Sequence, residues 1–245
     1  MKKTHPNSVI KASARQQLLG KYPIVIFAYI ISDFILSAIS QLSNSTLDIS
    51  RVSSIVIFVL FQFVLLLLSG IFLVGQNHLY LNIARKEAYS PRDIWYGFTH
   101  YADKILIIEL IISFHILIRC LPFILLLALW LATGNMFACF FMILSGVISL
   151  IYTIAILLNY SQTLFLILED PSATLAQLLE ASTLLMHGNM LSYLKLIISF
   201  AGLYILSVLS FGLGFLWVAP YFHASRTNFY LSLLRKRAAM RNSET

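Results

Sequence analysis

The chain has 245 residues, of which 59% are hydrophobic and only 11% are charged, and its mean hydropathy is +0.85. Soluble domains carry roughly 25% charged residues, so this composition excludes an ordinary soluble domain and a disordered protein. The net charge of +7 is interpreted as an orientation signal, and nucleic acid is not expected as a partner. Apolar runs of membrane-spanning length predict an all-α, polytopic membrane helix bundle with six transmembrane helices and two short cytoplasmic amphipathic helices.

The chain begins with a polar, basic segment, residues 1–21, which we expect to form a cytoplasmic N-terminus. The first span is predicted over 22–40 and the second over 52–74, with helical character continuing into Arg85-Lys86-Glu87. Ala38-Ile39-Ser40 resembles a signal-peptide cleavage site. The long polar start and the long apolar run nevertheless favour a retained helix.

A helix start of the capping-box type follows the second span. Ser90 is suited to be its N-cap, Pro91 its first residue and Asp93 the acidic residue three positions after the cap. We predict an amphipathic helix over 91–103 that lies in the cytoplasmic membrane interface. Its apolar face comprises Ile94, Phe98 and Tyr101, with Trp95 beside them.

The third and fourth spans are predicted over 105–132 and 136–168. The fourth is too long for one straight crossing, so we expect its last turns to project from the bilayer or the helix to be tilted. A second amphipathic helix is predicted over 172–187, with Asp170 as its N-cap and Gly188 at its end. Its apolar side holds Leu175, Leu178, Leu179 and Met186.

The last two spans are predicted over 191–210 and 215–231, so that 22–234 forms a single membrane domain and 235–245 a basic tail. With six spans and both termini inside, every Lys and Arg except Arg51 and Arg119 falls on the cytoplasmic side. Five spans would place the basic tail outside. The charge distribution therefore predicts a multi-pass plasma-membrane protein with cytoplasmic N- and C-termini.

Arg119 is the first candidate for a functional residue. It lies about 15 residues, or roughly 22 Å, beyond Lys104, which places it in the outer half of the membrane. His115 is one turn earlier on the same face, and Asp33 of the first span is a candidate counter-ion. Two interpretations stay open: an anion or proton site inside the bundle, and an Arg side chain that snorkels to the outer headgroups.

Other polar residues indicate no catalytic chemistry. Glu109 lies close to Lys104 and is interpreted as an interface carboxylate. The sequence contains no His-Glu-x-x-His, no Gly-x-Ser-x-Gly and no phosphate-binding glycine loop. We therefore expect no catalytic residue, no metal and no cofactor. Basic and aromatic residues near the inner interface suit anionic lipid headgroups.

Three groups of motifs resemble a known family. They are Tyr160-Ser161 followed by Phe165 to Pro171; Ser182-x-x-Leu185-Met186-x-Gly188-Asn189; and Gly212-x-Gly214-x-Leu216-Trp217-x-x-Pro220-Tyr221, continuing to Asn228-Phe229-Tyr230. The family comprises six-span bacterial integral membrane proteins that are widespread in Gram-positive species, and it is described only as a domain of unknown function. The resemblance covers roughly residues 75–230, with the first span unspecific. It implies the six-helix fold and the plasma membrane, but no activity and no functional residues.

Between the third and fourth spans the sequence departs from this family. Where the family usually has Pro-Gly and a short span, Leu121-Pro122-Phe123 is followed by a longer apolar stretch. We expect a local difference in the outer half.

The leading hypothesis for function is a non-enzymatic accessory or scaffold protein whose amphipathic helices dock a membrane-protein partner or lipids. The alternative is a transporter or carrier of a small molecule or lipid with a site near Arg119, favoured by a weak internal repeat and by Pro122 and Pro220 as helix breaks. A third hypothesis, an intramembrane hydrolase or transferase, requires two cytoplasmic polar residues within hydrogen-bond reach.

Overall fold

The computed structural model of the protein describes residues 7–46 and 52–242. These residues form helices and turns without a strand, which confirms the predicted all-α class. Five helices of this described part are long and apolar enough to cross a membrane: Tyr22–Gln41, Val56–Arg85, Ala102–Thr133, Met136–Glu169 and Met190–Leu209. The basic residues Lys2 and Lys3 and the predicted outer-loop residue Arg51 lie outside the described residues.

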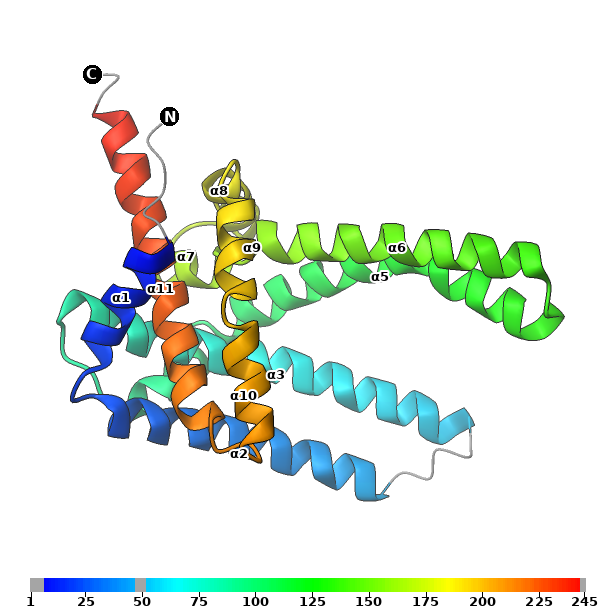
Figure 1. The fold of residues 1–245 in the computed structure, drawn as a ribbon, viewed down its shortest axis with the longest axis horizontal. Helices are drawn as coiled ribbons and strands as arrows, with labels where there is room; N and C mark the ends of the chain where they lie inside the picture. The colour runs from blue at the N-terminus through cyan, green and yellow to red at the C-terminus, as the bar shows by residue number, and fades with distance from the viewer. Residues whose placement is uncertain (1–6, 47–51, 243–245) are drawn as a thin grey trace.

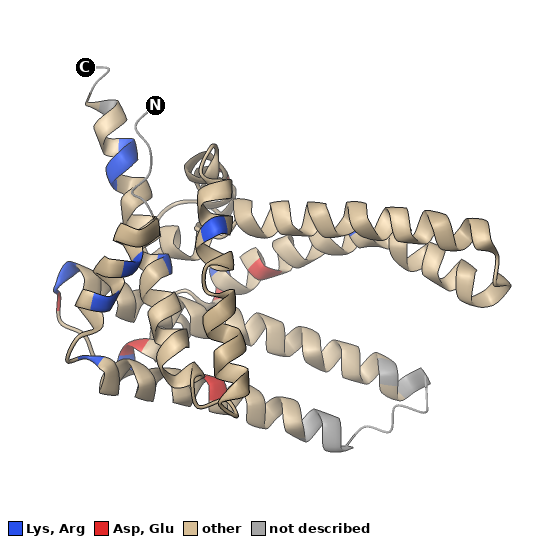
Figure 2. Cartoon of the chain, in the orientation of Figure 1, with Lys and Arg blue, Asp and Glu red and all other residues tan. Residues whose placement is uncertain are grey.

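Two long helical hairpins form two arms. The first comprises α2 (Tyr22–Thr46) and α3 (Val52–Arg85), and the second α5 (Ala102–Thr133) and α6 (Met136–Asn159). Figure 1 shows both arms pointing in the same direction, away from the rest of the molecule. Lys and Arg gather at the opposite end, so the arms are largely uncharged (Figure 2). This separation of charge is what a bilayer around the arms requires.

The N-terminal segment, expected only to be polar and basic, contains a packed helix, α1 (Asn7–Leu18). Apolar residues three to four positions apart give the helix one buried face. That face comprises Ile10, Ala14 and Leu18. The side chains of Gln17 and Asn228 exchange hydrogen bonds of 3.1 and 2.7 Å, and Arg15 Nε donates to Tyr221 Oη at 3.0 Å. The helix α1 is thereby fixed to α11 (Phe215–Arg241).

The amphipathic helix predicted over 91–103 is a shorter, broken segment. A 3-10 turn, η1 (Pro91–Trp95), is followed by α4 (Tyr96–His100), and α5 already begins at Ala102. The predicted capping box at Ser90 and Asp93 is confirmed. The segment packs tightly on α3 at two glycines. A Cβ added at Gly75 would overlap the Ile94 carbonyl oxygen, and one at Gly97 would overlap the Ile71 carbonyl oxygen.

The predicted fourth span is divided at residues 160–162 into α6 and α7 (Thr163–Glu169). The second amphipathic helix is α8 (Leu175–Met186), which begins later than predicted, because Thr174 forms a capping box with Gln177. Asp170 is therefore not the N-cap. Its carboxylate accepts hydrogen bonds from the Ser172 hydroxyl at 2.6 Å and the Ser172 N–H at 3.1 Å, and the hydroxyl bond lowers the pKa of Asp170. The predicted end of the helix is confirmed, with Gly188 at φ +71°.

The predicted fifth span is also broken, into α9 (Met190–Ile198) and α10 (Ala201–Leu209). The sixth predicted span lies in α11, which continues through the basic tail to Arg241 and is not among the five apolar helices. Figure 1 shows α9, α10 and α11 running across the arms. The core forms where these helices meet α1, α3 and α7, with Phe165 stacked on Tyr230 at a ring distance of 4.8 Å.

Candidate functional site

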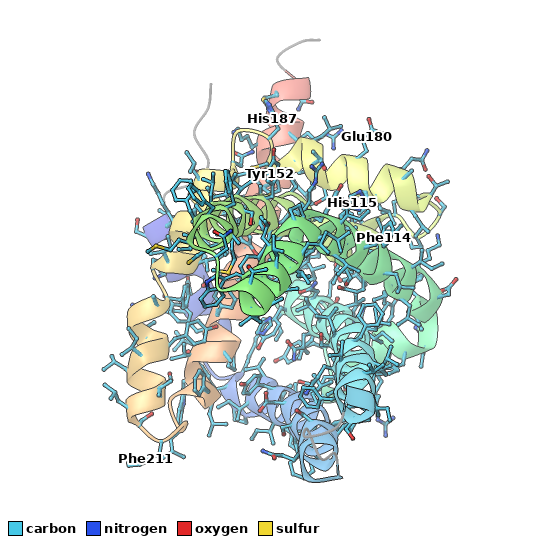
Figure 3. The ribbon with its side chains drawn as sticks, turned by 90° about the vertical axis from the view of Figure 1, so that its right-hand side faces the viewer. Phe114, His115, Tyr152, Glu180, His187 and Phe211 are labelled. Carbon is cyan, nitrogen blue, oxygen red and sulfur yellow. The ribbon has the colours of Figure 1, made fainter. Side chains whose placement is uncertain are left out.

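The three site residues predicted in the membrane do not converge. Arg119 is exposed on α5, and its guanidinium lies 5.1 Å from the centre of the Tyr152 ring on α6. His115 is exposed on the same helix, with Nδ1 2.8 Å from the Ile111 carbonyl oxygen (Figure 3). Asp33 lies in the other arm, exposed on α2. Within the described residues the only ion pair joins Arg85 and Glu169, so Asp33 is not the counter-ion of Arg119.

Replacing Arg119 by Leu tests whether this residue has a structural role. The visible interaction is one cation–π contact, worth about 0.5–1 kcal/mol at an exposed position. A charge in an apolar arm is itself costly, so removing the Arg119 charge offsets the loss of the cation–π contact. We therefore expect the free energy of unfolding of Arg119→Leu in detergent to stay within about 1 kcal/mol of the wild type. A loss of more than about 3 kcal/mol would indicate a buried partner for the guanidinium.

The apolar faces predicted to dock a partner mostly pack inside the molecule. Ile94, Leu178 and Met186 are buried. Half-buried positions are Phe98, Tyr101, Leu175 and Leu179, whereas Trp95 is 42% exposed. The prediction of a free docking face is wrong for the buried residues. Helical periodicity identifies an apolar face, but does not reveal whether lipid, a partner or the protein's own core covers that face.

A pocket of about 250 Å³ lies where α3, α5, α9 and α11 meet the break between α6 and α7. Most of its lining is apolar: Leu73, Ile112, Leu157, Leu158, Leu164 and Ile197. Five further side chains carry polar groups: Glu109, Tyr160, Ser161, Tyr193 and Arg226. We call this space the central pocket. An apolar lining with a few converging polar groups is typical of small-molecule sites.

Glu109 brings an unpaired carboxylate to the central pocket. It lies in α5, one of the apolar helices long enough to span a membrane, and is partly buried. The side chain crosses α3 at Gly70, where an added Cβ would stand 2.7 Å from Glu109 Cγ and Oε1. No described residue forms a hydrogen bond or an ion pair with this carboxylate. An ionisable group in such a helix costs several kcal/mol unless a partner compensates it.

Arg226 supplies the opposite charge from α11. Its Nε donates to Tyr193 Oη at 3.0 Å, and its guanidinium carbon lies 6.0 Å from the centre of the Phe222 ring. In the described part of the chain it has no carboxylate partner. The central pocket therefore contains one acid and one base that are not paired with each other.

The helix break that borders the central pocket is fixed by α8. Ser182 Oγ donates to the Asn159 carbonyl oxygen at 2.6 Å and accepts from the Gln162 N–H at 3.3 Å. These are backbone groups that the interrupted helix leaves without an internal partner. The break brings Tyr160 and Ser161 to the pocket lining. A continuous helix to residue 168, as predicted from hydropathy, would not have this geometry.

Sequence reasoning missed the central pocket, although one signal was available. The sequence predicts an interface carboxylate for Glu109 and a cytoplasmic, headgroup-facing cation for Arg226, and it indicates no role for Tyr193. Yet Glu109 is the only acidic residue between Asp103 and Glu169. An isolated acid in so long an apolar region is by default a functional candidate.

In the described part of the chain, no three His, Cys, Asp or Glu side chains group as metal ligands.

Comparison with known proteins identifies the family of the chain. A family model described as "Protein of unknown function (DUF975)" matches residues 1–237. The match covers α1 and the first arm, which the motif resemblance left out, and confirms the resemblance to a domain of unknown function. No curated protein and no solved structure matches the chain.

Proposed function

Because the chain belongs to this family of proteins of unknown function, we propose its function from the geometry of the central pocket. We propose that the protein is a non-enzymatic carrier that binds a small polar molecule in the central pocket and moves it across the membrane. The proposed binding site is the central pocket between α5 and α11, in place of the site near Arg119 that the sequence predicts. Orientation follows the positive-inside distribution, with both termini in the cytoplasm of a bacterial cell.

One observation carries the proposal: a carboxylate and a guanidinium line the same small pocket, and within the described residues neither forms an ion pair. Breaking or omitting one partner of a buried charge pair typically costs about 3–5 kcal/mol, because the remaining charge is uncompensated. Glu109 and Arg226 are each partly buried, and within the described residues neither has a partner of opposite charge, so each bears part of this cost without a ligand. A bound molecule that pairs with both charges would remove this cost. The two charges therefore favour binding of a ligand in the central pocket.

The helix breaks support transport rather than static binding. Discontinuous helices near a central site are common in secondary transporters, where they supply backbone groups to the substrate and act as hinges. Here two helices are interrupted, at residues 160–162 and at 199–200. The first break brings Tyr160 and Ser161 to the central pocket, and α9, the helix before the second break, contributes Tyr193 and Ile197.

A second candidate function, a scaffold for a membrane-protein partner, is favoured by the α5–α6 arm. Apolar side chains are exposed on all its sides, among them Phe137 at 78% and Phe140 at 63%. An arm of this kind must be covered by lipid or by another membrane protein. Anionic headgroups would suit the basic end of the molecule.

Native mass spectrometry of the protein, extracted gently from its own membrane, separates these functions. We expect a small molecule of stoichiometric amount on the wild type. Glu109→Gln and Arg226→Gln should each lose it, because each leaves a charge of the ligand without a partner. Arg119→Leu, which also removes a charge but lies outside the pocket, is the matched control and should retain the molecule.

Two results would contradict the carrier. One is a bound species that survives both pocket substitutions. The other is a stoichiometric membrane protein with no small molecule, which would establish the scaffold instead.

A further inference from the structure

We propose that the ligand of the central pocket is a small amphipathic zwitterion: its ammonium group binds Glu109, its carboxylate binds Arg226, and its apolar part lies against the aliphatic lining. This inference rests on the proposed function and adds the chemical class of the substrate. It follows from the charges, the free hydrogen-bonding groups and the size of the pocket.

The two charges determine the class. A ligand with only a positive charge would leave Arg226 uncompensated, and a ligand with only a negative charge would leave Glu109 uncompensated. A neutral ligand would compensate neither. Only a molecule with both charges pairs each of them, and it adds no net charge to the membrane interior.

The guanidinium of Arg226 is oriented for a carboxylate. Its Nε–H is already donated to the Tyr193 hydroxyl, which leaves its two terminal amino groups for the ligand. Paired N–H groups of one guanidinium match the two oxygens of a carboxylate. The Tyr193 oxygen accepts from Arg226 and keeps its own proton to donate. Tyr193 thus positions Arg226 and offers one more hydrogen bond to the anionic end.

The acidic end suits an ammonium group. Glu109 is confined against Gly70, and its carboxylate offers only acceptor oxygens when ionised. An ammonium group carries three donors and is the matching partner.

The volume and lining determine the remainder of the ligand. Drug-sized ligands need roughly 300–1,000 Å³, so a space of about 250 Å³ admits a smaller molecule. Leucine and isoleucine side chains surround the polar groups, which favours a short aliphatic chain between or beside the charged ends.

Three matched probes test this class with the full-length protein in nanodiscs at pH 7. L-leucine carries both charges, L-leucinamide only the positive one and 4-methylpentanoate only the negative one. Isothermal titration calorimetry should show binding of L-leucine and at least about tenfold weaker binding of the other two, since each lacks one charged hydrogen-bond partner. Glu109→Gln should remove the preference for L-leucine over 4-methylpentanoate. Arg226→Gln should remove the preference over L-leucinamide.

The outcomes separate the class of ligand from the function. If a probe with one charge binds as tightly as L-leucine, the zwitterion is excluded and the pocket remains a binding site. If none of the probes binds while native mass spectrometry still finds a species lost in Glu109→Gln, the class is wrong and the carrier stands. If no probe binds and no species is found, both proposals fail. The comparison of probes uses the wild type, so a variant that does not fold leaves the test intact.

Discussion

Gly75→Ala is expected to prevent η1 from packing on α3 and to destabilise the protein by about 3 kcal/mol or more. Overpacking in a core usually costs about 1–3 kcal/mol, because neighbouring side chains can rotate away. Here the added Cβ would meet the carbonyl oxygen of Ile94, which is backbone and has no rotamer to change. Thermal unfolding in detergent, followed by circular dichroism, measures the loss.

Gly202→Ala is the matched control for this substitution. Gly202 also lies in a helix, α10, but a Cβ added there has nothing within 4 Å. Alanine is favoured over glycine in helices by about 1 kcal/mol, so this variant should be as stable as the wild type or slightly more stable. Equal losses in both variants would show that helix geometry, and not the contact with Ile94, determines the cost.

Ser182→Ala is expected to cost about 3 kcal/mol and to weaken ligand binding in the central pocket. The hydroxyl satisfies a partly buried carbonyl and a buried N–H at the break between α6 and α7. Each unsatisfied buried group costs about 1–3 kcal/mol. Because this break borders the pocket, we expect the positions of Tyr160 and Ser161 to loosen as well. Urea unfolding and titration calorimetry measure the two effects.

The neighbouring residue supplies the control. Thr183→Ala also removes one hydroxyl from α8, but this hydroxyl is exposed and donates only to the Leu179 carbonyl of its own helix. Its loss should change the free energy of unfolding by less than about 0.5 kcal/mol. If Ser182→Ala is equally mild, the break is held by packing and not by this hydroxyl.

Hydropathy and local turn chemistry predicted a large part of the fold. The continuous helix from the second span to Arg85 is confirmed, as are the capping box at Ser90 and Asp93 and the helix end at Gly188. These features depend on residues close together in sequence. Such residues determine local backbone geometry irrespective of the surrounding fold.

The helix breaks and the central pocket depend on contacts between distant segments. Nothing in the residues around Asn159 interrupts an apolar helix; the break is stabilised by Ser182, from a different helix. In the same way, Glu109 and Arg226 share a pocket although α5 and α11 are far apart in sequence. Periodicity cannot indicate such pairs, because it describes one helix at a time.

The pairing of α1 with α11 has a consequence for biosynthesis. Gln17 and Asn228, which bind each other, are 211 residues apart. At roughly 5–20 residues per second, a ribosome needs about 10–40 s to make the second after the first. Both arms are synthesised during that time, while the apolar face of α1 still lacks its partner α11. Synthesis of α11 therefore completes the core, and the nascent chain must keep α1 from aggregating until then.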